Sequence, residues 1–477
     1  MRSSEWKRIA TFCALWTAGS LVASAQTFKT LVNFNGTDGA SPEFVTLAQG
    51  RDGNLWGTTQ GGGTANSGTA FRITPSGFLS DIFNFDGVHG AVPFAGVTLG
   101  RDNYLYGVTY QGGTNNLGTV FKLSPTGVIT VLFNFDGASG SLPIGGLTQG
   151  ADGNFYGTTD SGGTGKCTIS TPGCGTVFKI TPSGALTTLY NLTDATGAGP
   201  AAALVQATDG NFYGTTFGGG NSPGCFHGCG TVFRMTPTGA LTVIHTFRSS
   251  DGANPEAALI QGTDGNLYGT TSHGPSSGSC IFTGGCGTVF KMTRGGVLTT
   301  LYSFSGPDGG LPEASLVQGT DGNFYGTTTA GGSSTFCTGG CGTIFQITPS
   351  GTPMILHTFA GTDGGAPEGG LTQHTNGLFY GTTAGGLGTV FSLDMGLGPF
   401  VKTTTTLGKV GSRVQILGTG LTGATSVTFN GTPAATFTIY GDTYMTAIVP
   451  SGATTGLVQV TTPTGTLTSN VNFRVAP

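Results

Sequence analysis

The octapeptide Asp152-Gly153-Asn154-Phe155-Tyr156-Gly157-Thr158-Thr159 decides the fold, because the chain contains seven close copies of it. Its second aromatic residue recurs at intervals of 50 to 57 residues, as Trp56, Tyr106, Tyr156, Tyr213, Tyr268, Tyr325 and Tyr380. Self-similarity at a period of this length is the signature of a repeat architecture.

Each copy of the octapeptide sits at the same place in a longer unit. A loop with one proline and a short apolar run precede it, and its Asp-Gly pair predicts a tight turn before a strand. A glycine-rich loop, a strand such as 175–181, a Pro-Ser-Gly turn and a last strand such as 185–190 follow. Four short strands per unit without helical periodicity are typical of a propeller blade. We therefore predict an all-β, seven-bladed β-propeller.

The two ends of the repeat region favour a ring over an open solenoid, whose units also stack. The region opens with a lone strand of the fourth type, residues 27–34, and ends with a strand of the third type, residues 388–393. Pairing these strands completes the seventh blade and leaves no exposed edge.

A glutamine recurs three residues before the Asp or Asn of the octapeptide, and Leu99 interrupts the series. Two interpretations are open: a polar ring that lines a central channel, or side chains that satisfy loop backbone, which we favour. The residues are Gln49, Gln149, Gln206, Gln261, Gln318 and Gln373.

Eight cysteines form four close pairs, all in the loop between the second and third strands. An even number in an exported chain predicts disulfides. The predicted bonds are Cys167–Cys174, Cys225–Cys229, Cys280–Cys286 and Cys337–Cys341. The alternative, half a zinc site at 225–229, lacks a second ligand pair.

The first 25 residues predict a secretory signal peptide. Basic residues precede an apolar run over 9–22, and Ala23-Ser24-Ala25 is the small-residue cleavage site. Without this segment the chain has 15 basic and 21 acidic side chains, a net charge of −6 with no charge block. We therefore expect an extracellular or cell-surface protein with no transmembrane segment in the mature chain and no nucleic-acid partner.

The repeat pattern stops at Met395. We divide the chain into a signal peptide (1–25), a seven-repeat propeller (26–395), a hinge (396–400) and a small β-sandwich (401–477). Alternating strands are expected in the last part at 413–417, 426–429, 444–449, 456–461 and 471–475.

No residue set in the sequence predicts catalysis or metal binding. The Asp-Gly-Asn turns lack the further acids of a calcium loop, and the six histidines are scattered. Four glutamates follow the loop proline closely: Glu43, Glu256, Glu313 and Glu368. They suggest the rim of a channel mouth, but we interpret them as solvated loop residues. We therefore expect no cofactor and no metal.

The octapeptide, the Gly-Gly pair after it and the strand at 175–181 resemble the GloVer-type tandem repeat of "choice-of-anchor" bacterial surface proteins over about residues 30–395. The resemblance implies an exported bacterial repeat protein and carries no established activity. Members typically end in a surface anchor, whereas this sequence ends at 473–477 with neither an apolar tail nor a basic cluster.

The last part resembles an IPT/TIG domain, an immunoglobulin-like fold, in its stretches 410–412, 416–421, 427–434 and 449–453 with Gly456. In extracellular bacterial proteins this resemblance implies a spacer or an adhesive module. In transcription factors such domains contact DNA, which the signal peptide and the few basic residues argue against.

Together these features favour a non-catalytic binding or surface-display protein, with a glycan or an envelope protein as the ligand. The alternatives are an extracellular carbohydrate-active enzyme on a propeller scaffold and a structural spacer of the envelope.

Overall fold

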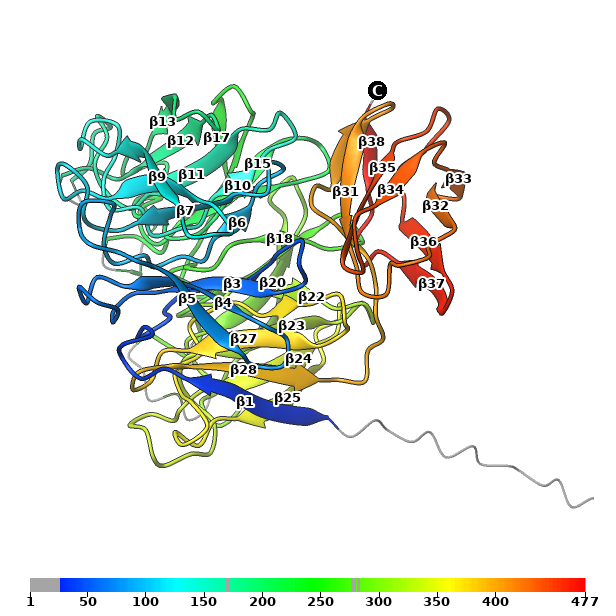
Figure 1. Cartoon of the computed structure of the whole chain (residues 1–477). Helices are drawn as coiled ribbons and strands as arrows, with labels where there is room; N and C mark the ends of the chain where they lie inside the picture. Colours follow the sequence, from blue (N-terminus) through cyan, green and yellow to red (C-terminus); the bar gives the residue numbers. More distant parts are fainter. Residues whose placement is uncertain are drawn as a thin grey trace, which may run out of the picture.

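The computed structural model describes residues 26–168, 172–222, 224–225, 227–275, 280 and 284–476. The predicted signal peptide, residues 1–25, lies outside these ranges. The described residues contain strands and turns and no helix. Seven four-stranded antiparallel sheets carry the repeats in a propeller-like arrangement, and a separate group of strands follows them (Figure 1). We number these repeat sheets one to seven in chain order.

The strands of the repeat sheets fall into four types by their order along each repeat. The first strands are β2 (Ala48–Gln49), β6 (Thr98–Leu99), β10 (Thr148–Gln149), β14 (Val205–Gln206), β18 (Ile260–Gln261), β22 (Val317–Gln318) and β26 (Thr372–Gln373). The second strands are β3 (Leu55–Thr59), β7 (Leu105–Thr109), β11 (Phe155–Thr159), β15 (Phe212–Thr216), β19 (Leu267–Thr271), β23 (Phe324–Thr328) and β27 (Phe379–Thr383). The third strands are β4 (Thr69–Ile73), β8 (Thr119–Leu123), β12 (Thr176–Ile180), β16 (Thr231–Met235), β20 (Thr288–Met292), β24 (Thr343–Ile347) and β28 (Thr389–Asp394). The fourth strands are β5 (Leu79–Asn84), β9 (Ile129–Asn134), β13 (Leu186–Asn191), β17 (Leu241–Thr246), β21 (Leu298–Ser303), β25 (Pro353–Thr358) and β1 (Thr27–Asn33).

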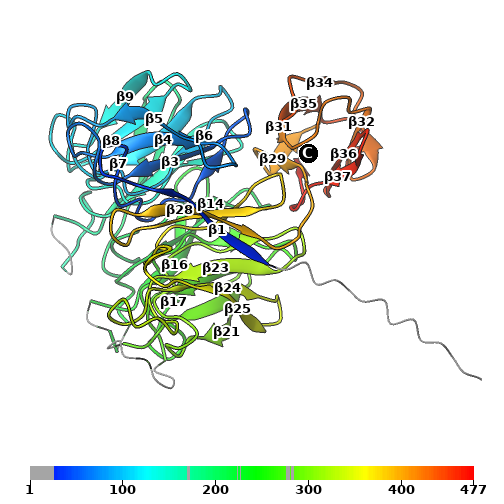
Figure 2. The same cartoon turned by 60° about the horizontal axis from the view of Figure 1, so that its bottom comes forward.

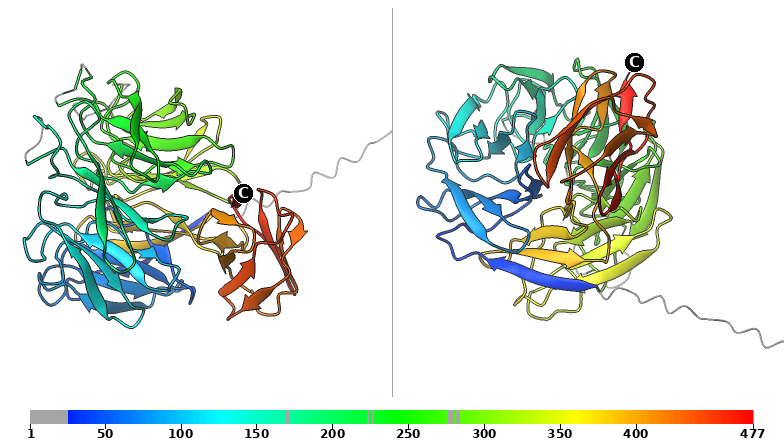
Figure 3. Two further views of the ribbon diagram at one scale, coloured as in Figure 1. Left: turned by 90° about the horizontal axis from the view of Figure 1, so that it is seen from above. Right: turned by 45° about the vertical axis from the view of Figure 1, so that its right-hand side comes forward.

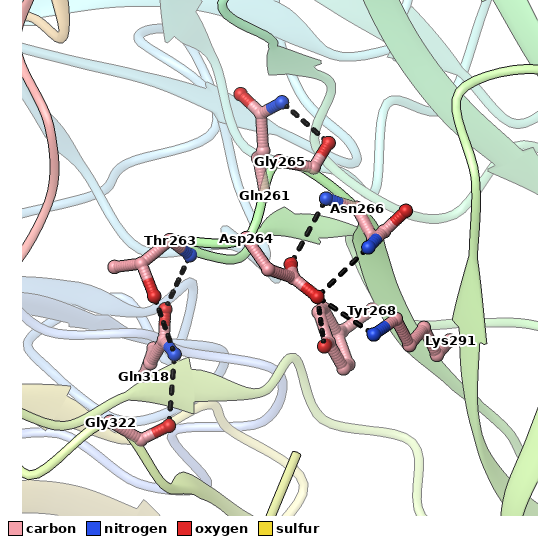
Figure 4. Close-up of polar contacts among 9 residues, drawn as sticks. All are labelled: Gln261, Thr263, Asp264, Gly265, Asn266, Tyr268, Lys291, Gln318 and Gly322. Atoms are coloured by element: carbon pink, nitrogen blue, oxygen red, sulfur yellow. Dashed lines mark hydrogen bonds and ion pairs between the residues drawn. The ribbon is translucent and has the colours of Figure 1, made fainter. Parts of the chain in front are cut away.

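The octapeptide folds as a turn followed by a buried strand, as its sequence predicts. In the fifth repeat, the Asp264 carboxylate accepts hydrogen bonds from the Asn266 amide (3.0 Å), the Tyr268 hydroxyl (2.9 Å) and the Lys291 ammonium group (2.7 Å) (Figure 4). Burial raises the pKa of Asp264, but these hydrogen bonds outweigh burial and lower it to about 2. The carboxylate therefore stabilises the turn and links it to the following strands.

Hydroxyl bonds and, at four of the junctions, aromatic ring contacts join neighbouring sheets. The Tyr156 ring stacks on Phe212 of the following sheet with ring centroids 4.0 Å apart. The Thr158 hydroxyl donates to the Ala202 carbonyl of the following repeat (3.2 Å). Because every residue of the second strands is buried, both faces of a sheet pack against neighbours.

The predicted pairing of the two ends of the repeat region is present. Strand β1 pairs antiparallel with β28 and completes the seventh sheet in the order β1-β28-β27-β26 (Figure 1). The Thr372 hydroxyl of this sheet donates to the Leu47 carbonyl of the first sheet (2.6 Å). The first and seventh sheets are therefore in contact, so the repeat sheets close on themselves.

The strands after residue 400 form a unit with its own core (Figure 2). Its sheets have the orders β29-β31-β35-β34 and β33-β32-β36-β37, with a parallel pair β30-β38. The sequence predicted β31, β32, β35, β36 and β38 within a few residues and missed the other five. The strands are β29 (Lys402–Thr403), β30 (Leu407–Lys409), β31 (Arg413–Leu417), β32 (Ser426–Phe429), β33 (Thr432–Pro433), β34 (Phe437–Ile439), β35 (Tyr444–Ile448), β36 (Val458–Thr462), β37 (Gly465–Thr468) and β38 (Arg474–Ala476).

The C-terminal unit lies beside the repeat sheets (Figure 3) and contacts the turns that begin the octapeptides. The Thr443 hydroxyl donates to the Arg51 carbonyl (2.7 Å), and the Gln415 amide donates to the Arg101 carbonyl (2.6 Å). Because the first strand of each repeat runs from the proline loop to this turn, the proline loops lie at the opposite end of the first strands, away from the C-terminal unit.

The glycine of the octapeptide predicts a large response to a small substitution. A Cβ atom at Gly157 would lie 2.6 Å from Phe178 Cζ and 2.8 Å from Leu147 Cδ2. We therefore expect Gly157→Ala to lower the free energy of unfolding by about 2 kcal/mol through overpacking. Chemical denaturation measures the change. The control is Gly398→Ala, because nothing lies within 4 Å of that position; equal effects of the two variants would contradict the explanation.

Candidate functional site

A central cavity of about 210 Å³ opens between the proline loops and the starts of the first strands. Small residues form most of its wall, including Gly96, Gly145, Ala202 and Ala257. Because these positions lack large side chains, the first strands leave space where the sheets converge. Longer side chains enter this space from the residues that follow the loop prolines.

The backbone holds these loops in a constrained conformation. The residue before each proline has a positive φ, for example 55° at Leu311 and 50° at Ala366, which non-glycine residues rarely adopt. At Ala366, two backbone hydrogen bonds hold this conformation. The Ala366 amide donates to the Cys341 carbonyl (3.0 Å), and the Ala384 amide donates to the Ala366 carbonyl (2.9 Å). Unusual backbone conformations of this kind cluster at functional sites.

Disulfide-bonded cysteines supply several of these fixing carbonyls. Asn254, Leu311 and Ala366 donate to the carbonyls of Cys229, Cys286 and Cys341. All four predicted disulfides are formed: Cys167–Cys174, Cys225–Cys229, Cys280–Cys286 and Cys337–Cys341. Three of them therefore support a loop that carries a glutamate of the cavity.

Glu256, Glu313 and Glu368 line the cavity, and Glu43 lies close enough to interact with Glu368. They come from the fifth, sixth, seventh and first repeats, which are consecutive around the ring. All four are partly buried. The interpretation of these residues as solvated loop positions is therefore wrong, because ring closure brings the four loops together over the cavity.

Burial and mutual repulsion raise the pKa values of the glutamates. Burial, followed by the charge of Glu313, raises the pKa of Glu256 to about 7. Burial, followed by the charges of Glu43, Glu313 and Glu256, raises the pKa of Glu368 to about 8. Burial also raises the pKa values of Glu43 and Glu313. Perturbed carboxylates gathered at one cavity are characteristic of functional sites.

The hydrogen bonding of the glutamates differs between repeats. Glu313 accepts a hydrogen bond from the Thr329 hydroxyl (2.8 Å), and Ser272 and Gln60 bond to Glu256 and Glu43 in the same way. The seventh repeat has Ala384 at this position, and no described residue donates to the Glu368 carboxylate. Glu368 therefore has unused hydrogen-bonding capacity at the cavity.

The wall opposite the glutamates is apolar. Ile144 and Ala201, from the third and fourth repeats, line it. Phe44, which follows Glu43, also lines the cavity, and Phe94 packs between Phe44 (centroids 6.2 Å apart) and Tyr110 (5.0 Å). No lysine, arginine or histidine is among the cavity-lining residues. One side of the cavity thus offers carboxyl groups and the other side offers apolar surface.

The six predicted glutamines do not line this cavity. They lie at the other ends of the first strands, where each joins two sheets: Gln318 Oε1 accepts from the Thr263 amide (2.9 Å), and its Nε2 donates to the Gly322 carbonyl (2.9 Å) (Figure 4). Equivalent bonds to the preceding sheet are made by Gln49, Gln149, Gln206, Gln261 and Gln373. These side chains satisfy loop backbone, and nothing in the repeat pattern indicated that they also link neighbouring sheets.

One group of metal-type ligand atoms occurs among the described residues, and it lies outside the cavity. Atoms of Cys167, Cys174 and Asp194 fall within 4.8 Å of one another. The two sulfur atoms are joined in a disulfide, so they are not available as the thiolates that bind metals.

A model of the Gloeobacter/Verrucomicrobia repeat matches the sequence over residues 17–222, 169–283 and 227–445. A search of curated proteins found no significant match. Similar solved structures include a streptogramin B lyase, with a TM-score of 0.52, 16% identity and coverage of 77% of this chain and 97% of that chain. For a virginiamycin B lyase from Staphylococcus aureus the TM-score is 0.51 at 13% identity, and the match covers 77% of this chain and 98% of that chain. For a fungal alcohol oxidase of the AA5 family in complex with copper the TM-score is 0.53 at 15% identity, and the match covers 92% of this chain and 98% of that chain. At these identities the similarity concerns the fold alone.

Two further observations bear on where the protein works. Four disulfides are typical of a protein that folds in an oxidising, extracellular environment. Within the described part of the chain, no helix has the length and apolar character needed to cross a membrane.

Proposed function

Because the chain belongs to the Gloeobacter/Verrucomicrobia repeat family, we propose that it is an exported, non-catalytic binding protein whose ligand occupies the central cavity. In this proposal the repeat sheets are the blades of a seven-bladed propeller, and the C-terminal unit is an IPT/TIG-like immunoglobulin sandwich. The seven closed four-stranded sheets and the two-sheet core of the C-terminal unit support these assignments.

The observation that carries the proposal is the division of the cavity into a carboxyl wall and an apolar wall. Such a site suits one sugar unit, because carboxylates accept hydrogen bonds from hydroxyl groups. A carboxyl group that keeps its proton also donates one. Phe44, which also lines the cavity, offers a surface for the apolar face of a sugar ring. The cavity of about 210 Å³ is small beside common ligand pockets, so we assign it to the end group of a glycan.

The same glutamates argue against a purely structural spacer. Burying carboxyl groups near one another destabilises the folded chain, and nothing in a spacer compensates for that cost. A binding site does, because the ligand bonds to the groups that burial leaves unsatisfied.

A second candidate function is glycoside cleavage, which the raised pKa values favour. A carboxyl group that remains protonated near pH 7 is suited to act as a general acid, and glycosidases pair such a group with an ionised carboxylate. Glu368 and Glu256 are the candidates for the protonated group.

Substitution of Glu368 tests the central cavity as a binding site. It distinguishes an effect on folding from an effect on binding, because the two are expected to change in opposite directions. The raised pKa of Glu368 means that the folded chain holds a proton which the unfolded chain, with a pKa near 4.5, releases. Stability is therefore highest below pH 4.5 and falls as the pH rises through about 8. We expect Glu368→Gln to melt at the parent temperature at pH 4 and at a higher temperature at pH 9.

Ligand affinity should fall in Glu368→Gln, although the melting temperature at pH 9 rises. An array of oligosaccharides, probed with the chain that begins at Gln26, identifies the ligand, and calorimetry compares the variants. At pH 9, where the Glu368 carboxyl is ionised, loss of one hydrogen bond to this carboxylate predicts affinity lower by about 10- to 100-fold in Glu368→Gln. Asp136→Asn, an exposed acid on an outer loop, is the control. Unchanged affinity in Glu368→Gln would refute the binding site. Release of shorter saccharides from the oligosaccharides in the same wells would show that the protein cleaves glycosides.

A further inference from the structure

A second cavity, of about 340 Å³, lies at the junction of the first and second repeat sheets with the C-terminal unit. The repeat sheets contribute Arg51, Asp52, Trp56 and Leu99, and the C-terminal unit contributes Tyr440 and Tyr444. This junction cavity is separate from the central cavity, since the two share no lining residue.

The junction cavity coincides with departures from the repeat pattern. Leu99 replaces the glutamine that joins neighbouring sheets at the other six positions, so no glutamine accepts the Arg51 amide. Trp56 replaces the tyrosine whose hydroxyl bonds to the turn carboxylate in five other repeats. Two residues that the other repeats use in this region are thus changed together here, where Tyr440 and Tyr444 of the C-terminal unit cover it.

These changes leave polar groups without partners. The Arg51 Nε atom is buried and has no hydrogen-bond partner. No described residue accepts a hydrogen bond from the Trp56 indole, and the exposed Asp52 carboxylate bonds only to Asn54 of its own turn, with Arg72 3.9 Å away. A buried donor without a partner is costly, so an acceptor supplied from outside would stabilise the site.

The aromatic groups of the junction cavity form a platform beside these polar groups. The rings of Tyr440 and Tyr444 are stacked with centroids 5.2 Å apart, and the Arg51 guanidinium lies 4.6 Å from the Tyr444 centroid. Tyr440 is 61% exposed. Its free face is accessible to a ligand.

We infer that the junction cavity is a second, independent saccharide-binding site. An exposed aromatic face, a guanidinium, an indole N–H and a carboxylate together match the apolar face and the hydroxyl groups of a sugar ring. Because both parts of the chain contribute side chains, an occupied site also ties the C-terminal unit to the repeat sheets.

Intrinsic fluorescence tests this inference directly. Trp56 is the one tryptophan of residues 26–477, since the other two are Trp6 and Trp16. The tryptophan emission of the chain that begins at Gln26, excited at a wavelength that tyrosine does not absorb, therefore reports on the junction cavity alone. Titration with neutral oligosaccharides of two to six units, in a panel of different linkages, should give a saturable change with at least one member.

Two variants show whether the change arises at this site. Tyr440→Ala should weaken binding by about tenfold, the effect of losing one aromatic contact. Phe78→Ala should not, although Phe78, in the first repeat, is even more exposed than Tyr440. In calorimetry, Trp56→Tyr should also bind more weakly, although it restores the residue of the other repeats and should fold normally.

The junction site and the central site are distinguishable. Glu368→Gln should leave the fluorescence titration unchanged, because Glu368 lines only the central cavity. If every saccharide leaves the emission unchanged, or if Tyr440→Ala titrates like the parent chain, the junction site is overturned, whatever the outcome at the central cavity.

Discussion

Deletion of residues 26–40, which gives a chain that begins at Ser41, is expected to lower the melting temperature by about 10 °C. The deletion removes β1 and with it the pairing to β28. It also removes Phe34, which is buried in the cluster of the first sheet, and Phe28, whose ring lies 5.4 Å from that of Phe391. At about 1.5 to 3 kcal/mol for each buried side chain, the loss is about 5 kcal/mol. For a domain of this size each kcal/mol corresponds to about 2 °C.

The truncated chain should also associate, because β28 becomes an exposed edge strand. Size-exclusion chromatography and thermal unfolding measure the two effects against the chain that begins at Gln26. Phe34→Ala, compared with the exposed Phe78→Ala, separates the packing contribution from the loss of strand pairing. A truncated chain that melts with its parent would show that closure by β1 does not stabilise the ring.

Removal of the four disulfides is expected to have the largest effect on stability. Each bond closes a loop with a sequence separation of 4 to 7 residues, and a loop of this length contributes about 2 kcal/mol. The four bonds lie in different sheets and should act nearly independently, so full reduction should lower the free energy of unfolding by about 8 kcal/mol. Denaturation with and without a reductant measures the loss, and peptide mapping without reduction checks the pairing.

The disulfides also provide a matched test of their link to the central cavity. Replacement of Cys337 and Cys341 by alanine releases the carbonyl that fixes the loop of Glu368, whereas the same change at Cys167 and Cys174 releases the loop of Ala201. Both double variants should lose stability, but the first should weaken ligand binding at the central cavity more, because its loop carries the carboxyl group of Glu368 and the other loop carries only the methyl group of Ala201. Equal binding by the two variants would contradict a role of the disulfide in holding Glu368.

The sequence alone determined the features that depend on neighbours along the chain. The Asp-Gly turn, the buried strand after it and the four cysteine pairs are local, because the contacting residues lie within a few positions of one another. The mismatch of strand types at the two ends also predicted the pairing of β1 with β28, since an unpaired edge is unfavourable. In the C-terminal unit the five strands found from sequence show clear alternation, whereas the five missed are mostly pieces of two to four residues, too short for a period to be seen.

Only the tertiary structure decided which residues form the two cavities. Glu256, Glu313 and Glu368 are more than 50 positions apart in the sequence, and each of them considered alone resembles an exposed loop residue. Ring closure brings them together and partly buries them. Their presence in consecutive repeats was a visible signal, but its meaning depends on where the loops meet. The junction of Trp56 with Tyr440 was not predictable at all, because the docking of the C-terminal unit on the first two sheets follows from surface complementarity, and no period in the sequence records it.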